Sequence, residues 1–80
     1  MDKKQVYDRV VKVTSQVLNI SPDEIKPESN FVFDLGAEST QSVQLVAAFE
    51  EEFGIELEGE AALTVQTVGD AAEFVSKFVK

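Results

Sequence analysis

The sequence predicts an all-α fold: a four-helix bundle with three longer helices and one short helix, and with a long loop between the first and second helices. Apolar residues recur at helical spacing in three separate stretches of the chain. The one stretch in which they alternate as in a strand has no second strand to pair with. Eighty residues are also too few for two hydrophobic cores. We therefore expect residues 1–80 to form a single domain.

The first helix is expected from about Lys3 to Leu18. Its valines follow the i, i+4, i+7 and i+11 spacing of an amphipathic helix. They are Val6, Val10, Val13 and Val17. Because β-branched residues have a lowered helix propensity, this helix should depend on burying that stripe against the rest of the domain.

The long loop should contain one short turn and then an ordered segment. Ser21, Pro22 and Glu24 have the pattern of a capping box with proline at the first helical position, and Pro27 ends the turn. Over residues 26–36 the helical period is lost and the apolar side chains alternate. We expect a loop pinned by its aromatic residues and leading to a site.

The second helix is expected after Gly36, which can take the positive φ of a sharp turn, and should run to Phe53. Its side chains form two stripes. The stripe at core spacing consists of Leu45, Val46, Phe49 and Phe53, and the neighbouring one of Thr40, Val43 and Ala47. The pattern leaves open whether the second stripe is also buried or is spare.

The remaining sequence predicts one short helix and one longer helix. The segment from Gly54 to Leu63 has room for a loop and a short helix. Thr67 and Asp70 then resemble an N-cap pair. They open a last helix with an apolar stripe and with lysines near its end, where positive charge favours the macrodipole. The stripe is Val68, Ala72, Val75 and Phe78 or Val79, and the lysines are Lys77 and Lys80.

Composition argues against an enzyme. The chain has no Cys and no His, so it lacks a thiol nucleophile, thiolate metal ligands and the usual general base. Three successive glutamates at positions 50–52 point in different directions on a helix and make a poor chelate. We expect no catalytic residue and no metal site. The N-terminal sequence contains no apolar stretch long enough for a signal peptide or membrane span, so we expect a cytoplasmic protein without stable membrane insertion.

The net charge is −8, and its distribution is uneven. Residues 27–76 contain no Lys or Arg but hold eleven acids. These are Glu28, Asp34, Glu38, Glu50, Glu51, Glu52, Glu56, Glu58, Glu60, Asp70 and Glu73. Such a field repels nucleic acid and anionic lipid and attracts basic protein surfaces. We expect protein partners that present Lys and Arg, and no nucleic acid.

A serine stands near the head of the second predicted helix. Ser39 follows the turn at Gly36 and lies between Glu38 and Thr40. Serine at a helix start most often caps the free amides. The same position also suits a phosphodiester on the hydroxyl, because free N–H groups and the positive helix end favour phosphate. The residues by themselves leave both readings open.

The segment from Asp34 to Ser39, Asp-Leu-Gly-Ala-Glu-Ser, resembles the Asp-Leu-Gly-Ala-Asp-Ser attachment motif of acyl carrier proteins. Glu-Glu-Glu-Phe at residues 50–53 and Val-Gln-Thr-Val at residues 65–68 extend the resemblance over most of the chain. It implies that a phosphopantetheinyl transferase, with Mg²⁺ and coenzyme A, attaches 4′-phosphopantetheine to Ser39. The arm would carry acyl groups as thioesters for fatty-acid or related synthesis, and the acyl chains would shelter among the helices.

The resemblance also implies that the protein is a monomer that docks on basic patches of acyl-processing enzymes through its second helix. The residues implied in recognition by the transferase and these partners are Asp34, Glu38, Thr40, Gln41, Val43, Gln44, Ala47, Glu50 and Glu51. Three of them depart from the family pattern: Thr40 replaces a leucine, and Gln41 and Gln44 replace acids. Because charges at an interface rim set association rate and partner choice, we expect a specialised carrier.

Two other functions fit the same pattern. A peptidyl, aminoacyl or polyketide carrier would share the fold and the serine, although the Gly-Ala-Glu before Ser39 differs from the Gly-Gly-His of many peptidyl carriers. A helical interaction module would never carry the arm and would use Ser39 only as an N-cap.

Overall fold

The computed structural model describes residues 2–57 and 65–79. Its elements are the α-helix α1 (Lys3–Leu18), the short 3₁₀ helix η1 (Pro22–Glu24), and the α-helices α2 (Ser39–Phe53) and α4 (Val68–Ser76). The described residues form no strand, so the predicted all-α class is confirmed, with a long loop between α1 and α2. The short helix expected before Leu63 falls largely within residues 58–64, outside the described residues.

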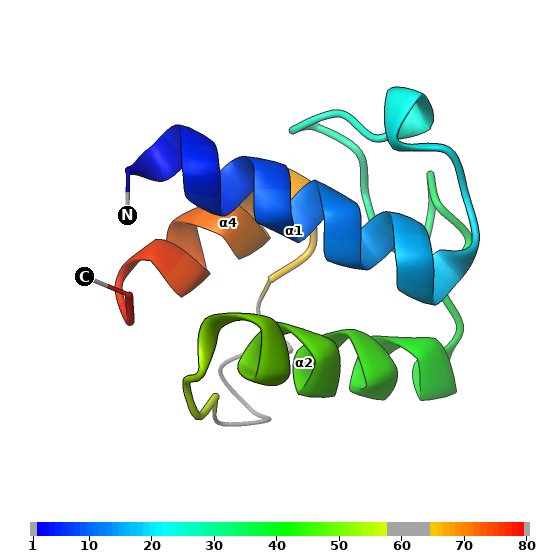
Figure 1. Cartoon of the computed structure of the whole chain (residues 1–80). Coiled ribbons are helices and arrows are strands. Elements are labelled where there is room, and N and C mark those ends of the chain that lie inside the picture. The colour runs from blue at the N-terminus through cyan, green and yellow to red at the C-terminus, as the bar shows by residue number, and fades with distance from the viewer. Residues whose placement is uncertain (1, 58–64, 80) are drawn as a thin grey trace.

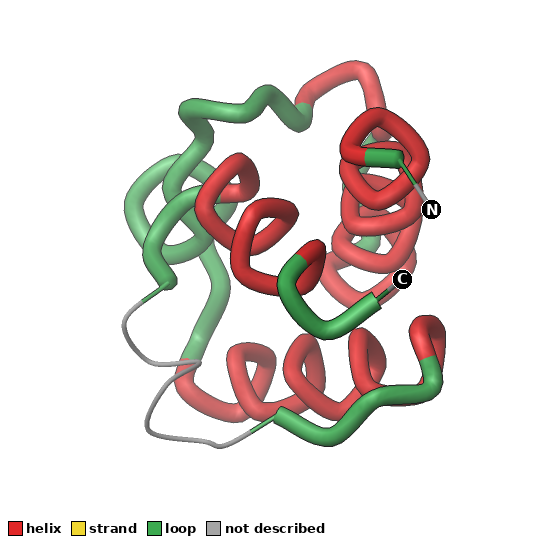
Figure 2. The backbone as a smooth tube through the Cα atoms, turned by 90° about the vertical axis from the view of Figure 1, so that its left-hand side faces the viewer, coloured by secondary structure: helices red, strands yellow, loops and turns green. Residues whose placement is uncertain are grey.

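α1 is the common packing partner of α2 and α4. In Figure 1, α2 runs in the opposite direction to α1, and Figure 2 shows that it lies across α1 and not parallel to it. The direct contact between α2 and α4 is slight by comparison. The start of α1 and the end of α4 lie at the end of the bundle opposite the start of α2 (Figure 1).

α1 begins and ends as its local sequence requires. The Asp2 Oδ1 accepts a hydrogen bond from the Gln5 backbone N–H at 2.8 Å, and the Gln5 Oε1 accepts one from the Asp2 N–H at 3.2 Å. This reciprocal pair is a capping box that satisfies two otherwise free donors. The helix ends at Asn19, whose φ of 56° is the left-handed conformation that asparagine tolerates.

The core is formed by most of the predicted stripe residues together with Ile25, Phe31, Ala37 and Ala71, whereas Phe78 is exposed. Its buried apolar residues are Val6, Val10, Val13, Ile25, Phe31, Ala37, Leu45, Phe49, Val68, Ala71, Ala72 and Val75. Val17 of the first stripe and Phe53 of the second are partly buried at its edge, and Val46 is partly buried but is not packed against the core. The β-branched side chains of α1 therefore have the tertiary packing on which that helix was expected to depend.

The turn at η1 has its predicted cap but not its predicted capping box. The Ser21 hydroxyl accepts from the Asp23 N–H at 3.4 Å, and Pro22 occupies the first helical position. The Glu24 N–H donates instead to the Ser21 carbonyl oxygen at 3.0 Å, which is the i to i+3 bond of a 3₁₀ turn. The amide that a capping box would use is thus already bonded.

The long loop is fastened to the first turn of α4. The N–H of Val68 donates to the Ser29 carbonyl at 3.0 Å, and the N–H of Gly69 donates to the Pro27 carbonyl at 2.8 Å. These bonds satisfy amides that have no partner within the helix. A Cβ at position 69 would lie 3.0 Å from the Pro27 carbonyl oxygen, so glycine permits this close approach. Thr67 caps α4 as predicted, by accepting from the Asp70 N–H at 3.1 Å.

Candidate functional site

Ser39 is the first residue of α2 and is exposed to solvent. Of the two readings that the sequence left open for Ser39, the one as N-cap is contradicted, because the cap is Glu38, one residue earlier. The Gln41 Oε1 accepts a hydrogen bond from the Glu38 backbone N–H at 2.9 Å. The helix start is therefore held by Glu38 and Gln41, and the Ser39 hydroxyl is accessible from solvent.

The turn before Ser39 fixes where α2 begins. Gly36 has a φ of 71°, which confirms the predicted positive-φ turn. Ala37 follows it with its methyl group buried, and its N–H donates to the Phe31 carbonyl at 2.8 Å. A buried side chain and a backbone bond thus anchor the chain two residues before Ser39.

The segment that precedes this turn is braced by Asn30 and Asp34. The Asn30 Oδ1 accepts from the backbone N–H groups of Val32 and Phe33, each at 2.9 Å. The Asp34 Oδ2 accepts from the Asn30 N–H at 2.7 Å. The sequence reading assigned Asp34 to partner recognition and did not consider Asn30. The sequence signal for this bracing is the presence of an asparagine and an aspartate in one loop, because both side chains readily form hydrogen bonds to nearby backbone amides.

The second stripe of α2 faces solvent, which answers the question that the sequence left open. Thr40, Val43 and Ala47 are all exposed, and Val43 is 71% exposed. Gln44 and Glu51, also named as recognition residues, are exposed on the same helix. α2 therefore presents polar and small apolar side chains to any partner that approaches this face.

The glutamates at positions 50–52 have three different environments. The Glu50 Oε2 accepts from the Leu57 backbone N–H at 2.9 Å, so this partly buried side chain braces the chain after α2. The Glu52 Oε2 lies 3.6 Å from the Arg9 Nη1 of α1. Only Glu51 is fully exposed. Of the two glutamates in this run that were assigned to recognition, Glu51 is the more available to a partner.

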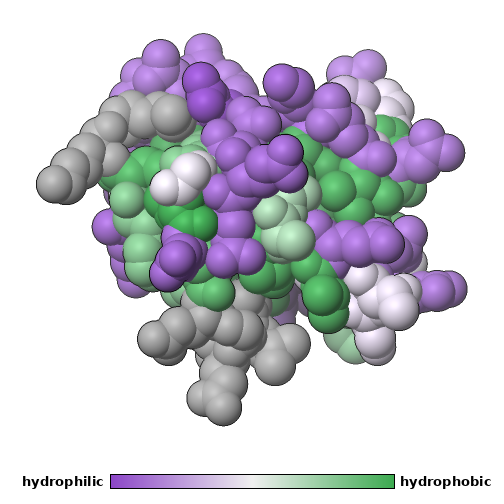
Figure 3. Space-filling view, turned by 60° about the horizontal axis from the view of Figure 1, so that its bottom comes forward, coloured by the Kyte–Doolittle hydropathy of each residue, from purple (hydrophilic) through white to green (hydrophobic). Residues whose placement is uncertain are grey.

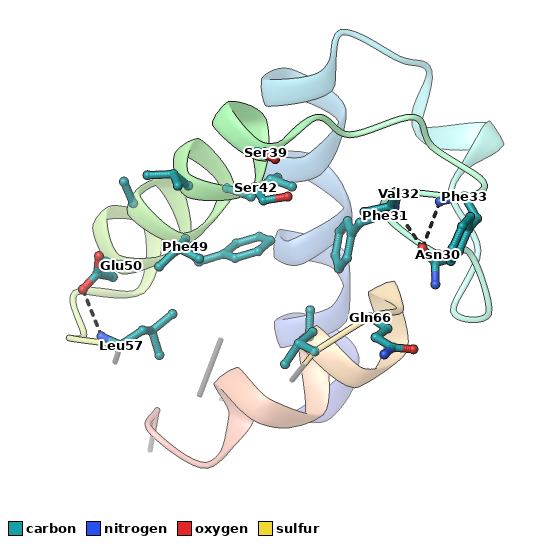
Figure 4. Close-up of a pocket in the computed structure, with 16 residues that line it drawn as sticks. Asn30, Phe31, Val32, Phe33, Ser39, Ser42, Phe49, Glu50, Leu57 and Gln66 are labelled. Atoms are coloured by element: carbon teal, nitrogen blue, oxygen red, sulfur yellow. Dashed lines mark hydrogen bonds between the residues drawn. The ribbon is translucent and has the colours of Figure 1, made fainter. Parts of the chain in front are cut away.

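An apolar cavity of about 710 Å³ lies between α2, the loop at residues 30–33 and the start of α4. Such a volume is typical of small-molecule sites, which span roughly 300–1,000 Å³. Phe31 and Phe49 point into the cavity from opposite sides (Figure 4). Its lining residues are Asn30, Phe31, Val32, Phe33, Ser39, Ser42, Val43, Leu45, Val46, Ala47, Phe49, Glu50, Leu57, Val65, Gln66 and Ala71. Ser39 is one of them, so the exposed hydroxyl and the cavity belong to one site.

The arrangement of the helices explains the cavity. α2 and α4 both pack on α1 but make little direct contact, so the space between them is lined by side chains without being filled. The sequence reading treated Phe49 as core and Phe31 as a loop anchor. Both are buried in the core and also line the cavity. On the face that carries α2, hydrophobic side chains reach the surface between hydrophilic ones (Figure 3).

The site suits a long arm joined through a phosphate. The N–H groups in the first turn of a helix have no intrahelical acceptor, and the partial positive charge at this end favours an anion. An exposed hydroxyl on the first residue of α2 places a phosphate close to that end. The remainder of an arm attached there starts at the edge of the apolar cavity.

No helix in the described part of the chain is long and apolar enough to cross a membrane.

Residues 8–75 match the family model for the phosphopantetheine attachment site. The match spans 68 of the 80 residues and includes α2 with the turn before it. Carrier domains of this family are not catalysts: a phosphopantetheinyl transferase supplies their prosthetic arm, and client enzymes then act on what the arm carries. The chain belongs to this family of phosphopantetheine carrier domains, and its cofactor is 4′-phosphopantetheine.

Proposed function

We propose that the protein is an acyl carrier protein in which Ser39 bears the 4′-phosphopantetheine arm. The observation that carries this proposal is the position of Ser39, an exposed hydroxyl on the first residue of α2 that also lines a 710 Å³ apolar cavity. The arm supplies a thiol, which holds the acyl group as a thioester. The residues of this chain present the hydroxyl, accommodate the phosphate and shelter the cargo.

Attachment forms one bond and breaks another. The Ser39 Oγ attacks the phosphorus of coenzyme A that carries the pantetheine, and a phosphodiester bond forms. The pyrophosphate P–O bond breaks, adenosine 3′,5′-bisphosphate leaves, and the hydroxyl proton passes to a base on the transferase. The chain has no His or Cys that could serve as this base, so its own task is to hold the hydroxyl in an accessible position.

Two neighbouring hydroxyls are less suited to attachment. Ser42 also lines the cavity but is partly buried. Thr40 is exposed but is not among the residues that line the cavity. Only Ser39 combines exposure with a place at the cavity among the described hydroxyls of this turn.

The lining of the cavity favours acyl groups over aminoacyl or peptidyl groups. Most of its side chains are aliphatic or aromatic, and its amides and hydroxyls belong to four residues. These are Asn30, Ser39, Ser42 and Gln66. The charged residue of the lining, Glu50, already accepts a hydrogen bond from the Leu57 N–H at 2.9 Å, whereas an alkyl chain gains about 0.8 kcal/mol for each CH₂ group buried against the apolar side chains. Fatty-acid synthesis or a related acyl pathway is therefore the role that we favour.

Client enzymes would dock on the exposed face of α2 with a basic surface. Glu38 and Glu51 supply negative charge there, and Val43 and Ala47 supply small apolar contacts. Gln44 is exposed on the same helix and adds no charge. This distribution supports a specialised carrier over one that serves the main fatty-acid synthesis enzymes.

Intact-mass measurement tests attachment. The apo protein would be incubated with coenzyme A, Mg²⁺ and a broad-specificity transferase, and should gain the mass of one phosphopantetheine. S39A should gain none, while the matched hydroxyl deletions S42A and T40V should be modified like the wild type. No gain by the wild type, as expected of an interaction module without an arm, or gain by S39A, would overturn the assignment.

Thermal unfolding of loaded proteins tests the cargo. Octanoyl and aminoacyl groups would be placed on the same arm, and their midpoints compared with that of the unloaded holo protein. Because ligation to the folded state stabilises it, an octanoyl chain that enters the cavity should raise the midpoint. A rise with aminoacyl cargo alone would instead favour a peptidyl or aminoacyl carrier.

A further inference from the structure

Phe33 is the most exposed large apolar side chain in the described structure. It is 88% exposed, and its neighbour Val32 is 54% exposed. The loop nevertheless holds both residues firmly, because their N–H groups donate to the Asn30 Oδ1 and the Gly36 N–H donates to the Val32 carbonyl at 3.2 Å. A phenyl ring held in water by a well-bonded loop contributes little to the fold and is available to a partner.

Phe33 lies across the cavity from Ser39, on the side of the loop (Figure 4). Val32 and Phe33 from the loop and Val43 from α2 line the same cavity as Ser39. We call these three exposed residues the mouth patch. An enzyme that forms a bond to the Ser39 Oγ must cover this opening, since one partner in a standard interface buries about 800 Å² of surface. The enzyme would therefore cover the mouth patch whenever it acts on Ser39.

The charges around the patch indicate what kind of surface fits it. Asp34 and Glu38 are exposed next to it, and no Lys or Arg occurs between Lys26 and Lys77. A second copy of this chain would bring the same acids against them, and an anionic lipid surface would also be repelled. A protein with an apolar socket and a rim of Lys or Arg complements both the ring and the acids.

We infer that the mouth patch is an anchor for the phosphopantetheinyl transferase, with the Phe33 ring inserted in an apolar socket on that enzyme. The inference rests on the proposed attachment at Ser39. In addition to the docking face of α2, the transferase would then contact the loop between α1 and α2. Buried aromatic side chains at the centre of an interface commonly dominate its affinity, and acids at the rim steer the encounter.

Transferase kinetics with Phe33 variants test the anchor. F33A should raise the KM for the apo protein about tenfold, the change expected for a hot-spot side chain, and leave kcat unchanged. F33L should recover most of the affinity. F78A is the matched control, because Phe78 is also an exposed phenylalanine, at 46%, but follows the end of α4 and does not line the cavity. F33A and F33L should keep the wild-type unfolding midpoint, whereas F78A should lower it slightly, because the Phe78 ring packs edge-to-face on Phe74 with ring centroids 5.2 Å apart.

The contact is apolar, so the F33A effect should persist at about 0.5 M salt, where exposed charges are largely screened. An unchanged KM for F33A, or an equal rise for F78A, would overturn the anchor while leaving attachment at Ser39 intact. Sedimentation would detect a different occupant: a wild-type dimer that F33A abolishes, with unchanged KM, would assign the patch to self-association. Failure of wild-type Ser39 to be modified would remove the proposed function and the anchor together.

Discussion

Glutamates at positions 41 and 44 should raise the activity of fatty-acid synthesis enzymes on this carrier. Gln44 is exposed, so Q44E adds a charge to the docking face without disturbing a described contact. Gln41 is partly buried and accepts the Glu38 N–H at 2.9 Å. A glutamate can accept the same bond, and a negative charge in the first helical turn is favourable. Both substitutions therefore change charge while keeping the helix start.

The expected size follows from the exposure of the two sites. An exposed ion pair with a Lys or Arg of the enzyme contributes about 0.2–1 kcal/mol. Two independent pairs would contribute about 0.4–2 kcal/mol, which corresponds to a rise of about 2- to 30-fold in kcat/KM for the double variant. The gain should shrink as salt rises, because the Debye length is already about 10 Å at 0.1 M salt.

The assay measures kcat/KM for the holo protein with a malonyl transacylase and a ketoacyl synthase of fatty-acid synthesis, at low and high salt. Q16E is the control, because Gln16 is an exposed residue of α1 and receives the same added charge outside α2. If Q41E and Q44E leave kcat/KM unchanged, or if Q16E raises it equally, glutamines on the docking face do not explain a specialised partner choice.

Three further predictions concern stability and titration. Thr14 is fully buried and its Oγ1 has no hydrogen-bond partner in the described structure, so T14V should stabilise the protein by about 1–3 kcal/mol in urea unfolding, whereas T14S should not. N30A removes the acceptor of two loop amides and should destabilise the fold by about 1–3 kcal/mol in the same assay. The pKa of Tyr7 is raised above 10.0, mainly because burial disfavours the charged phenolate, and further by the negative charges of Glu28 and Asp8. The stability this gives is complete below pH 10.0 and is lost as pH rises through the raised pKa. Ultraviolet titration of this sole tyrosine should show a pKa that E28Q lowers only in part.

The helices were predictable from sequence because each has a long stripe that a single periodicity describes. Val6, Val10 and Val13 are buried as their spacing required. The cap of α2 could not be identified from the sequence, because serine is a preferred N-cap residue and glutamate is not. The hydrogen bond between the Gln41 side chain and the Glu38 amide supports Glu38 in that position.

The roles of Asp34 and Glu50 could not be read from the sequence. Asp34 bonds to an amide four residues earlier, and Glu50 bonds to one seven residues later. Each bond depends on the path of a loop, which side-chain periodicity does not describe. The resemblance implies that these two carboxylates bind partners, whereas in the structure each accepts a backbone hydrogen bond that holds a loop in place. Substituting either residue would change docking and loop geometry together, so Glu51 gives the cleaner measure of charge in docking.

The residues that hold the helices together differ from most of those that line the cavity. α1 holds α2 and α4 through its own buried stripe, and that stripe does not line the cavity. The cavity is lined instead by α2, the loop at residues 30–33 and the start of α4. Because α2 and α4 depend little on each other for packing, the acyl chain that we propose as cargo could occupy the space between them without loss of the contacts that keep each helix on α1. Ser39 starts α2 at this space, so the same helix that presents the hydroxyl also forms one wall of the cavity.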